Sequence, residues 1–159
     1  MYKKEINIQE VVDFISQCDE STKLYVGCDS ERIIVNGKWY ADYITAVVVH
    51  INGNNGCKIF GAVEREPDFE KRSDKPKMRL MNEVYRVADV YLKLAEVIDL
   101  PIEVHLDINP SEMFKSNVAL NEAIGYIKGM CNVVPMVKPK AFAASCAADK
   151  YKEVAKKVA

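Results

Sequence analysis

The sequence has almost no excess charge of either sign and few residues of the types that build disulfide or zinc sites. Its 159 residues include 22 Lys and Arg against 23 Asp and Glu, a formal net charge of −1. This excludes a histone-like protein that holds nucleic acid by bulk positive charge. The five cysteines are odd in number and form no C-x-x-C pair, and there are two histidines. A disulfide scaffold, a zinc ribbon and a zinc hydrolase are therefore disfavoured.

Long apolar segments and nucleotide-binding motifs are also missing. No apolar run approaches the roughly 18 residues of a membrane span, and no apolar segment follows the N-terminal Met-Tyr-Lys-Lys-Glu. Neither G-x-x-x-x-G-K-[ST] nor G-x-G-x-x-G occurs. We expect a cytoplasmic protein without a membrane segment. The length predicts a single domain over residues 1–159, with an N-terminal accessory helix within 1–22 and a core over 23–159.

The first half of the sequence predicts one helix followed by three antiparallel strands. Residues 7–19 repeat apolar side chains at helical spacing after Asn7, whose side chain suits an N-cap. Asn36-Gly37 is the dipeptide preferred in type I′ hairpin turns, and it joins two of the predicted strands. The three strands are predicted at 23–28, 39–51 and 57–63, and the apolar residues 33–35 lead into the Asn36-Gly37 turn. Because turns join them in succession, they predict an antiparallel meander.

The second half alternates helices and strands. The charged residues 64–77, with two prolines, predict a loop. The elements expected after it are a helix at 77–99, a strand at 102–108, a helix to about 130, a strand at 133–137 and a helix at about 141–158. The two later strands, joined by a helix, should be parallel with a right-handed crossover. The fold class is therefore α/β, a mixed five-stranded sheet of an antiparallel meander and two parallel strands, flanked by helices.

Four carboxylates stand at positions that such a sheet can bring to one edge. Asp29 ends the first predicted strand and Asp107 closes the strand at 102–108. Ligands of open sheets gather beyond the carboxyl ends of strands. Glu83 is the only charge on the apolar stripe of the long helix, where a carboxylate costs free energy unless cations or donors pair with it. Asp149 lies in the final helix among small residues that would allow close approach to the sheet.

Each carboxylate also has an ordinary structural explanation. Asp29 can start a turn, and Glu83 can lie at the border of the stripe and reach water. Asp107 can belong to a solvent-facing strand face, and Asp149 is favourable near the first turn of a helix. The combination is more informative, because four carboxylates within a few ångströms repel one another. Hard divalent cations such as Mg²⁺ relieve that repulsion, and two ions about 3.5–4 Å apart would activate water and stabilise the leaving oxygen of a phosphodiester.

The segments around these carboxylates support a family relationship. They are Leu24–Ser30, Glu103–Pro110, Ala119–Gly129 and Lys138–Asp149 with Tyr151. Together they resemble the ribonuclease H-like superfamily of metal-dependent nucleases, and locally the YkuK-like family of predicted RNase H-related proteins, over about residues 23–155. The resemblance implies an RNase H-like fold, with catalytic and metal-binding carboxylates that map to Asp29, Glu83, Asp107 and Asp149. Glu64, Glu66 and Asp89 are alternative candidates for the position assigned to Glu83.

Further polar residues surround the same edge. Candidates to support the metal ligands are Ser30, His105 and Asn109, although a histidine within a strand is more often packed and hydrogen-bonded. Candidates to contact a phosphate backbone are Lys115, Asn117, Lys138 and Lys140, although a single lysine is more often solvated surface charge.

We therefore expect a Mg²⁺- or Mn²⁺-dependent nuclease that hydrolyses phosphodiester bonds in nucleic acid by a two-metal-ion mechanism. RNA, DNA and hybrid substrates all remain open. The alternative is a non-catalytic nucleic-acid- or protein-binding module on the same fold, because a fold does not determine a function.

Overall fold

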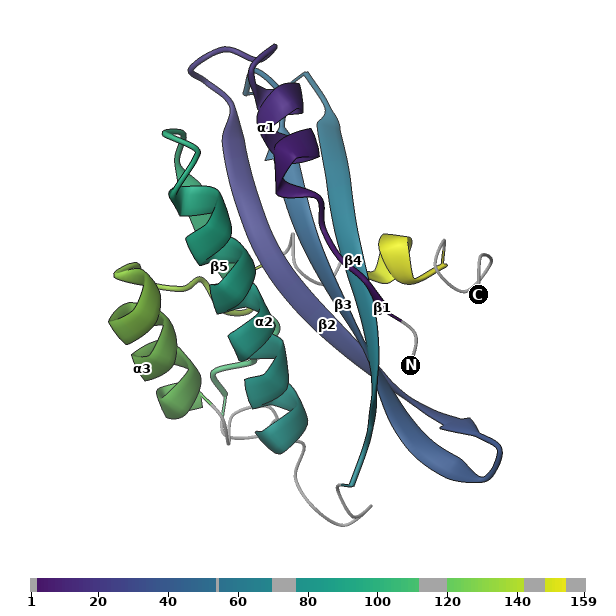
Figure 1. The fold of residues 1–159 in the computed structure, drawn as a ribbon. Coiled ribbons are helices and arrows are strands. Elements are labelled where there is room, and N and C mark those ends of the chain that lie inside the picture. Colours follow the sequence, from purple (N-terminus) through teal and green to yellow (C-terminus); the bar gives the residue numbers. More distant parts are fainter. Residues whose placement is uncertain (1–2, 54, 70–76, 112–119, 142–147, 154–159) are drawn as a thin grey trace.

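The structure is a computed structural model that describes residues 3–53, 55–69, 77–111, 120–141 and 148–153. The named elements are, in order, β1 (Lys3–Lys4), α1 (Ile8–Ile15), β2 (Lys23–Val35), β3 (Lys38–His50), β4 (Cys57–Pro67), α2 (Lys77–Ala95), β5 (Ile102–Leu106) and α3 (Leu120–Cys131). Residues 148–153 are also helical. Helices α1, α2 and α3 lie on one side of a twisted sheet, and the helical segment 148–153 lies on the other (Figure 1).

The sheet is mixed and has five strands in the order β1-β4-β3-β2-β5. β2, β3 and β4 form the predicted antiparallel meander, and β5 pairs in parallel with β2. The Asn36-Gly37 turn forms as predicted, with φ values of 51° and 78° that suit a type I′ hairpin. Asn7 is also confirmed as an N-cap, because its side chain accepts a hydrogen bond from the backbone of Glu10.

The strand order differs from the predicted one at both edges. The edge beside β4 is β1, a two-residue strand that was not predicted. The predicted strand at 133–137 forms only an isolated parallel bridge between Met136 and His105. Met136 donates to the carbonyl of Val104 and accepts from the N–H of Leu106, and Lys138 donates to the carbonyl of Ile108, so the pairing beside β5 is short. The predicted parallel direction is retained in that bridge.

The first predicted strand is longer than expected, which changes the place of Asp29. β2 runs without a break to Val35 and pairs with β3 from Lys23 to the hairpin turn. Asp29 therefore lies in the middle of a strand and not at its end, which corrects the prediction. The polar Ser30–Arg32 stretch stays extended because the turn fixes the register of β2 against β3 along the whole hairpin.

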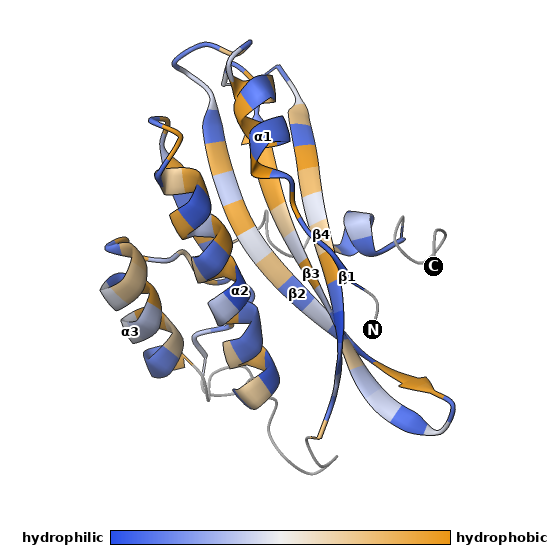
Figure 2. Ribbon diagram, in the orientation of Figure 1, coloured by the Kyte–Doolittle hydropathy of each residue, from blue (hydrophilic) through white to orange (hydrophobic). Residues whose placement is uncertain are grey.

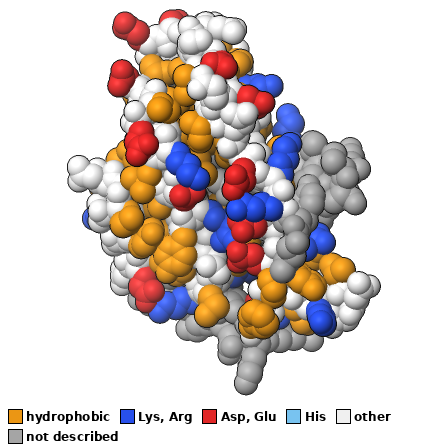
Figure 3. All heavy atoms as spheres, in the orientation of Figure 1, with side chains coloured by type: hydrophobic (Ala, Val, Ile, Leu, Met, Phe, Trp, Pro, Cys, Tyr) orange, Lys and Arg blue, Asp and Glu red, His pale blue; other side chains and the backbone are white. Residues whose placement is uncertain are grey.

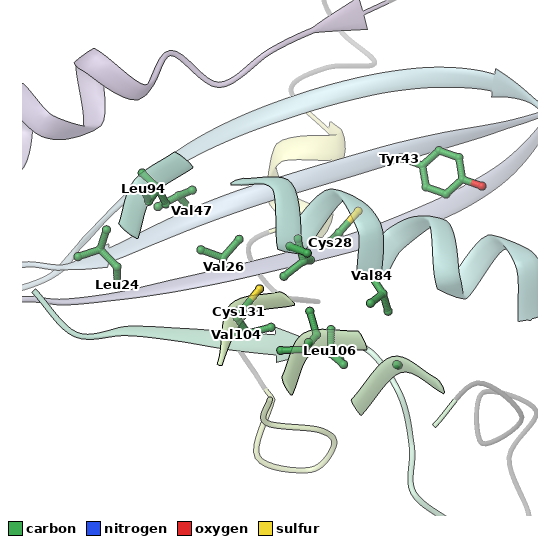
Figure 4. Packing of buried hydrophobic residues seen from close by; sticks show 14 of the residues in the cluster. Leu24, Val26, Cys28, Tyr43, Val47, Val84, Leu94, Val104, Leu106 and Cys131 are labelled. Atoms are coloured by element: carbon green, nitrogen blue, oxygen red, sulfur yellow. The ribbon is translucent and has the colours of Figure 1, made fainter. Parts of the chain in front are cut away.

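The core lies between the sheet and the helical layer. Along the first half of β2 hydrophobic residues alternate with less hydrophobic ones (Figure 2), and Leu24, Val26 and Cys28 face this core. Val26 of β2, Val84 and Leu94 of α2, and Val104 of β5 meet there (Figure 4), each no more than 1% exposed. Burial of each such side chain contributes about 1.5–3 kcal/mol. Val11 of α1 is fully buried in the same cluster, so the N-terminal helix packs onto the shared core.

Candidate metal centre

Asp29 of β2 and Asp107, the residue just after β5, lie side by side where the parallel pairing of the two strands ends. The last registered pair of the β2–β5 ladder is Cys28 with Leu106, and each aspartate is the next residue along the chain. Cys28 and Leu106 are buried on the α2 side of the sheet (Figure 4), at 2% and 3% exposure. This packing fixes both backbones at the end of the ladder and so brings the two aspartates together there.

Glu83 reaches the two aspartates from helix α2. It is 5% exposed and lies on the buried face of the helix, next to the fully packed Val84. Asp29, Glu83 and Asp107 each offer a carboxylate oxygen, and these oxygens all lie within 4.8 Å of one another. We call these three residues the acidic triad. The side chain of Ser30 hydrogen-bonds to Glu83, so this neighbour of Asp29 also holds the glutamate in place.

The electrostatics of the triad reflect its burial and crowding. The pKa of Asp29 is raised from 3.8 to about 6, first by burial and then by the charge of Asp107, against the opposing charge of Lys152. The pKa of Glu83 is raised well above its ordinary value of 4.5, first by burial and then by the charges of Asp29 and Asp107. Carboxylates placed in this way favour either a proton or a metal cation.

Two lysines lie against the triad. The Lys138 ammonium is 2.7 Å from an oxygen of Asp107. The Lys152 ammonium is 3.5 Å from Asp29 and 3.2 Å from Asp149. Asp149 itself is 59% exposed and hydrogen-bonds to the side chain of Asp29, so it borders the triad without belonging to it. The structure therefore brings together three of the four predicted carboxylates and places the fourth beside them.

The helical segment 148–153 is packed on the outer face of the sheet. Ala148 is fully buried against Ile44 and Val63, and Tyr151 packs against the same cluster. The Tyr151 ring lies so close to Gly61 that a Cβ there would approach it to 2.6 Å. The segment that carries Asp149 and Lys152 is thus held by apolar packing, independently of its charges.

The other predicted supporting residues have different surroundings. Ser30 contacts the triad directly, through its side chain to Glu83 and its backbone N–H to Asp29 at 2.9 Å. Asn109 accepts a hydrogen bond from the backbone of Ser111 at 2.9 Å, and so shapes the turn after β5. His105 is 1% exposed, hydrogen-bonds to Glu103 at 3.2 Å, and stacks edge-on against Tyr25. Burial lowers the pKa of His105.

Of the predicted nucleic-acid contacts, only two can be placed. Lys138 pairs with Asp107, and Lys140 is exposed two residues later. Lys115 and Asn117 lie outside the described residues. Lys152 was missed as a site residue; the available signal was its position three residues after Asp149 on the same predicted helix. Glu64 and Glu66, the rivals to Glu83, both pair with Arg86 instead. Asp89 pairs with Lys93.

The face that carries α1 and α2 has mixed charge. Acidic and basic side chains lie next to one another there (Figure 3). A groove of about 280 Å³ between β1, β4 and α2 is lined by both signs, including Lys3, Glu64, Arg86 and Asp89, and by none of the triad. Within the described residues this groove offers no surface of one sign to a nucleic-acid backbone. No helix among those residues is both long and apolar enough to pass through a membrane.

The donor set of the triad suits a hard divalent cation. All three side chains offer oxygen, which Mg²⁺ and Mn²⁺ prefer, and the buried Glu83 is costly to ionise without a nearby cation. Asp29, Glu83 and Asp107 would hold such an ion, and Asp149 hydrogen-bonds to the side chain of Asp29 beside them.

One comparison with known proteins gives a match. The family model described as "Ribonuclease H-like" matches residues 7–153. No curated protein and no solved structure matches the chain significantly. Proteins of this family have a nuclease-type fold and typically bind divalent metal ions. The match spans most of the sequence, and the chain therefore belongs to the ribonuclease H-like family.

Proposed function

We propose that this protein is a metal-dependent nuclease that hydrolyses phosphodiester bonds in nucleic acid by a two-metal-ion mechanism. The observation that supports this most is the acidic triad, with three carboxylate oxygens within 4.8 Å of one another on three separate elements. A purely structural cluster of this kind is unfavourable, because burial and like charge both oppose ionisation of Glu83. Membership of the ribonuclease H-like family favours nuclease chemistry over other metal-dependent reactions.

Within this proposal each residue has a defined task. Asp29 and Asp107 would be the main ligands of the metal ions, Glu83 and Asp149 would add further oxygens, and Ser30 holds Glu83 through its side-chain hydrogen bond. Bound Mg²⁺ or Mn²⁺ supplies water activation and charge neutralisation at the phosphate. Lys138 pairs with Asp107 and Lys140 is exposed two residues later; in this proposal both hold the phosphate backbone. We also propose the narrower YkuK-like relationship on the local sequences around Asp29 and Asp107.

The test is cleavage of a labelled panel of single-stranded RNA and DNA, duplexes, an RNA–DNA hybrid and a four-way junction. The reactions run in Mg²⁺, in Mn²⁺ and in chelator. The variant is Asp107→Asn, which keeps the shape of a triad member and removes its charge. The matched control is Asp89→Asn, an exposed aspartate on α2 that pairs with Lys93.

We expect cleavage that needs the metal, is lost in Asp107→Asn and persists in Asp89→Asn. The loss should be at least about 10²-fold, because removal of one group that stabilises transition-state charge costs that much in other enzymes. Cleavage that survives chelator, or that survives Asp107→Asn with the fold intact, would rule the assignment out.

A non-catalytic binding module is the second candidate, and one observation favours it. Lys138 and Lys152 already neutralise part of the acidic cluster, so part of its charge is balanced without a metal. This alternative predicts salt-sensitive binding of nucleic acid, or binding of a protein, without turnover in any metal. The same panel, followed by binding measurements at two salt concentrations, separates the two candidates.

A further inference from the structure

The ammonium groups of Lys138 and Lys152 take positions that a metal cation would also favour. Lys138 contacts Asp107 at 2.7 Å, and Lys152 bridges Asp29 at 3.5 Å and Asp149 at 3.2 Å. Two members of the acidic triad are therefore each paired with a lysine. The two lysines approach from different segments, one just after the bridge at Met136 and the other on the outer helical segment.

Lys152 is held in place by the packing of its own segment. Ala148 is fully buried against the sheet and Tyr151 packs beside it, with the Lys4 ammonium 5.3 Å from the centre of the Tyr151 ring. The Lys152 side chain is only 20% exposed. A lysine on a solvated helix face would not be confined in this way. Its ammonium is thus directed at the carboxylates by apolar contacts that do not depend on the charge of the site.

The two lysines balance part of the negative charge of the site and therefore oppose the binding of another cation. The triad and Asp149 carry four formal negative charges when ionised, and the two ammonium groups offset half of them. A divalent cation that enters the triad meets oxygens of Asp29 and Asp107 that already interact with a positive charge. Like charges repel strongly at such distances in a partly buried site. Binding of a divalent cation to the triad therefore competes with the pairing of the lysines to Asp29 and Asp107.

We propose that Lys152, together with Lys138, is a resident counter-cation of the acidic triad that stabilises the metal-free protein and competes with the divalent cation for Asp29 and Asp107. Lys152 is in this account a positioning residue: it acts on the metal through the two aspartates that it pairs with. This rests on the proposed metal-binding function of the triad, and it adds that metal affinity is set by a lysine as well as by the carboxylates.

The experiment measures Mn²⁺ binding to the full chain, without nucleic acid, by the electron paramagnetic resonance signal of free Mn²⁺. The variant is Lys152→Met, which keeps the aliphatic stem and removes the charge. Lys152→Arg tests rescue by a retained charge. The control is Lys150→Met, an exposed lysine on the same segment. Glu83→Gln, alone and combined with Lys152→Met, shows whether the measured ion is held by the triad.

We expect Lys152→Met to bind Mn²⁺ about fivefold more tightly than wild type, which is equivalent to about 1 kcal/mol. Lys152→Arg and Lys150→Met should keep the wild-type affinity. In chelator, Lys152→Met should melt a few degrees below wild type, and Mn²⁺ should raise its melting temperature more than that of wild type. A merely structural role would weaken metal binding along with stability, so tighter binding is the distinguishing result.

Three results would overturn the proposal, and they have different consequences for the proposed metal site. Unchanged or weaker Mn²⁺ binding in Lys152→Met, with binding abolished by Glu83→Gln, removes the role of Lys152 and leaves the proposed metal site intact. If Lys150→Met binds Mn²⁺ more tightly by the same factor as Lys152→Met, the effect comes from general surface electrostatics and not from the position of Lys152. Absence of Mn²⁺ binding in both wild type and Lys152→Met removes this role and the proposed function together.

Discussion

Replacement of Asp29 by asparagine should stabilise the protein in chelator while it destroys metal binding. In the unfolded chain Asp29 ionises near pH 3.8, whereas in the folded protein its pKa is about 6. Between these values the folded state binds more protons than the unfolded state, so stability falls as the pH rises through this window and stays lower above it. Asp29→Asn has no proton to lose and escapes this cost.

The size of the effect follows from the same pKa difference. Raising a pKa from 3.8 to about 6 corresponds to about 3 kcal/mol of lost stability at pH 8. The buried amide of the variant has its own desolvation cost, which reduces the expected gain to about 2 kcal/mol. For a protein of this size that gain raises the melting temperature by about 4–8 °C. The backbone hydrogen bond from Ser30 to Asp29 can be kept, because an asparagine oxygen also accepts it.

The assay is thermal unfolding of wild type and Asp29→Asn in chelator at several pH values. Below about pH 4 the variant should melt slightly lower than wild type, because only the cost of its buried amide remains; the order should reverse as the pH rises, with the variant higher from about pH 6 upward. The control is Asp89→Asn, whose exposed pair with Lys93 should change stability by less than about 1 kcal/mol. An Asp29→Asn protein that is less stable than wild type in chelator at pH 8 would refute the reasoning, because the crowded carboxylates would then not strain the fold.

Three further predictions concern the surroundings of the triad. Mn²⁺ affinity should rise with pH between about 5 and 7, since protons on Asp29 and Glu83 compete with the metal, and a titration at fixed ionic strength that shows no such rise would contradict this. Gly61→Ala should destabilise the protein by about 1–3 kcal/mol in denaturant unfolding, because its Cβ would meet the Tyr151 ring. His105→Gln should lower stability but keep wild-type Mn²⁺ affinity, since its packing and hydrogen bond lie away from the triad; a large loss of affinity would place it in the site instead.

Much of the candidate site could be predicted because it depends on local patterns. The isolated charge of Glu83 on an apolar helical stripe indicated a buried carboxylate, and the helix does bury it. Asp107 directly follows β5, in which Ile102, Val104 and Leu106 alternate with polar residues. The predicted placement of these two residues stays correct even where a predicted boundary is wrong by a few residues. The reason is that neighbouring apolar side chains determine the buried face of a helix and the end of a strand.

The parts that could not be predicted depend on long-range pairing. β1 is two charged lysines whose strand conformation exists only because Val63 and Glu64 pair with them. The continuation of β2 past Asp29 comes from the register of the whole hairpin and not from the polar residues themselves. Asp29 still reaches Asp107, because what matters is where the β2–β5 ladder ends and not where β2 ends.

The position of Lys152 at the site also depends on long-range contacts and could not be predicted. Its sequence neighbourhood is a basic, Ala-rich helix in which most lysines would be solvated. Only the contacts of Ala148 and Tyr151 with the outer face of the sheet reveal that this lysine is directed at Asp29. A contact between residues 123 positions apart carries no local signal in one sequence.

The central claim is that Asp29, Glu83 and Asp107 hold divalent cations, and its most direct test is a crystal structure of the protein with Mn²⁺, with anomalous diffraction measured at the manganese edge. We predict one or two anomalous peaks within coordination distance, about 2.1 Å, of oxygens from all three side chains. The ammonium groups of Lys138 and Lys152 should have moved away from Asp107 and Asp29. Crystals grown in millimolar Mn²⁺ that show no peak at the triad, with both lysines still paired, would contradict the account.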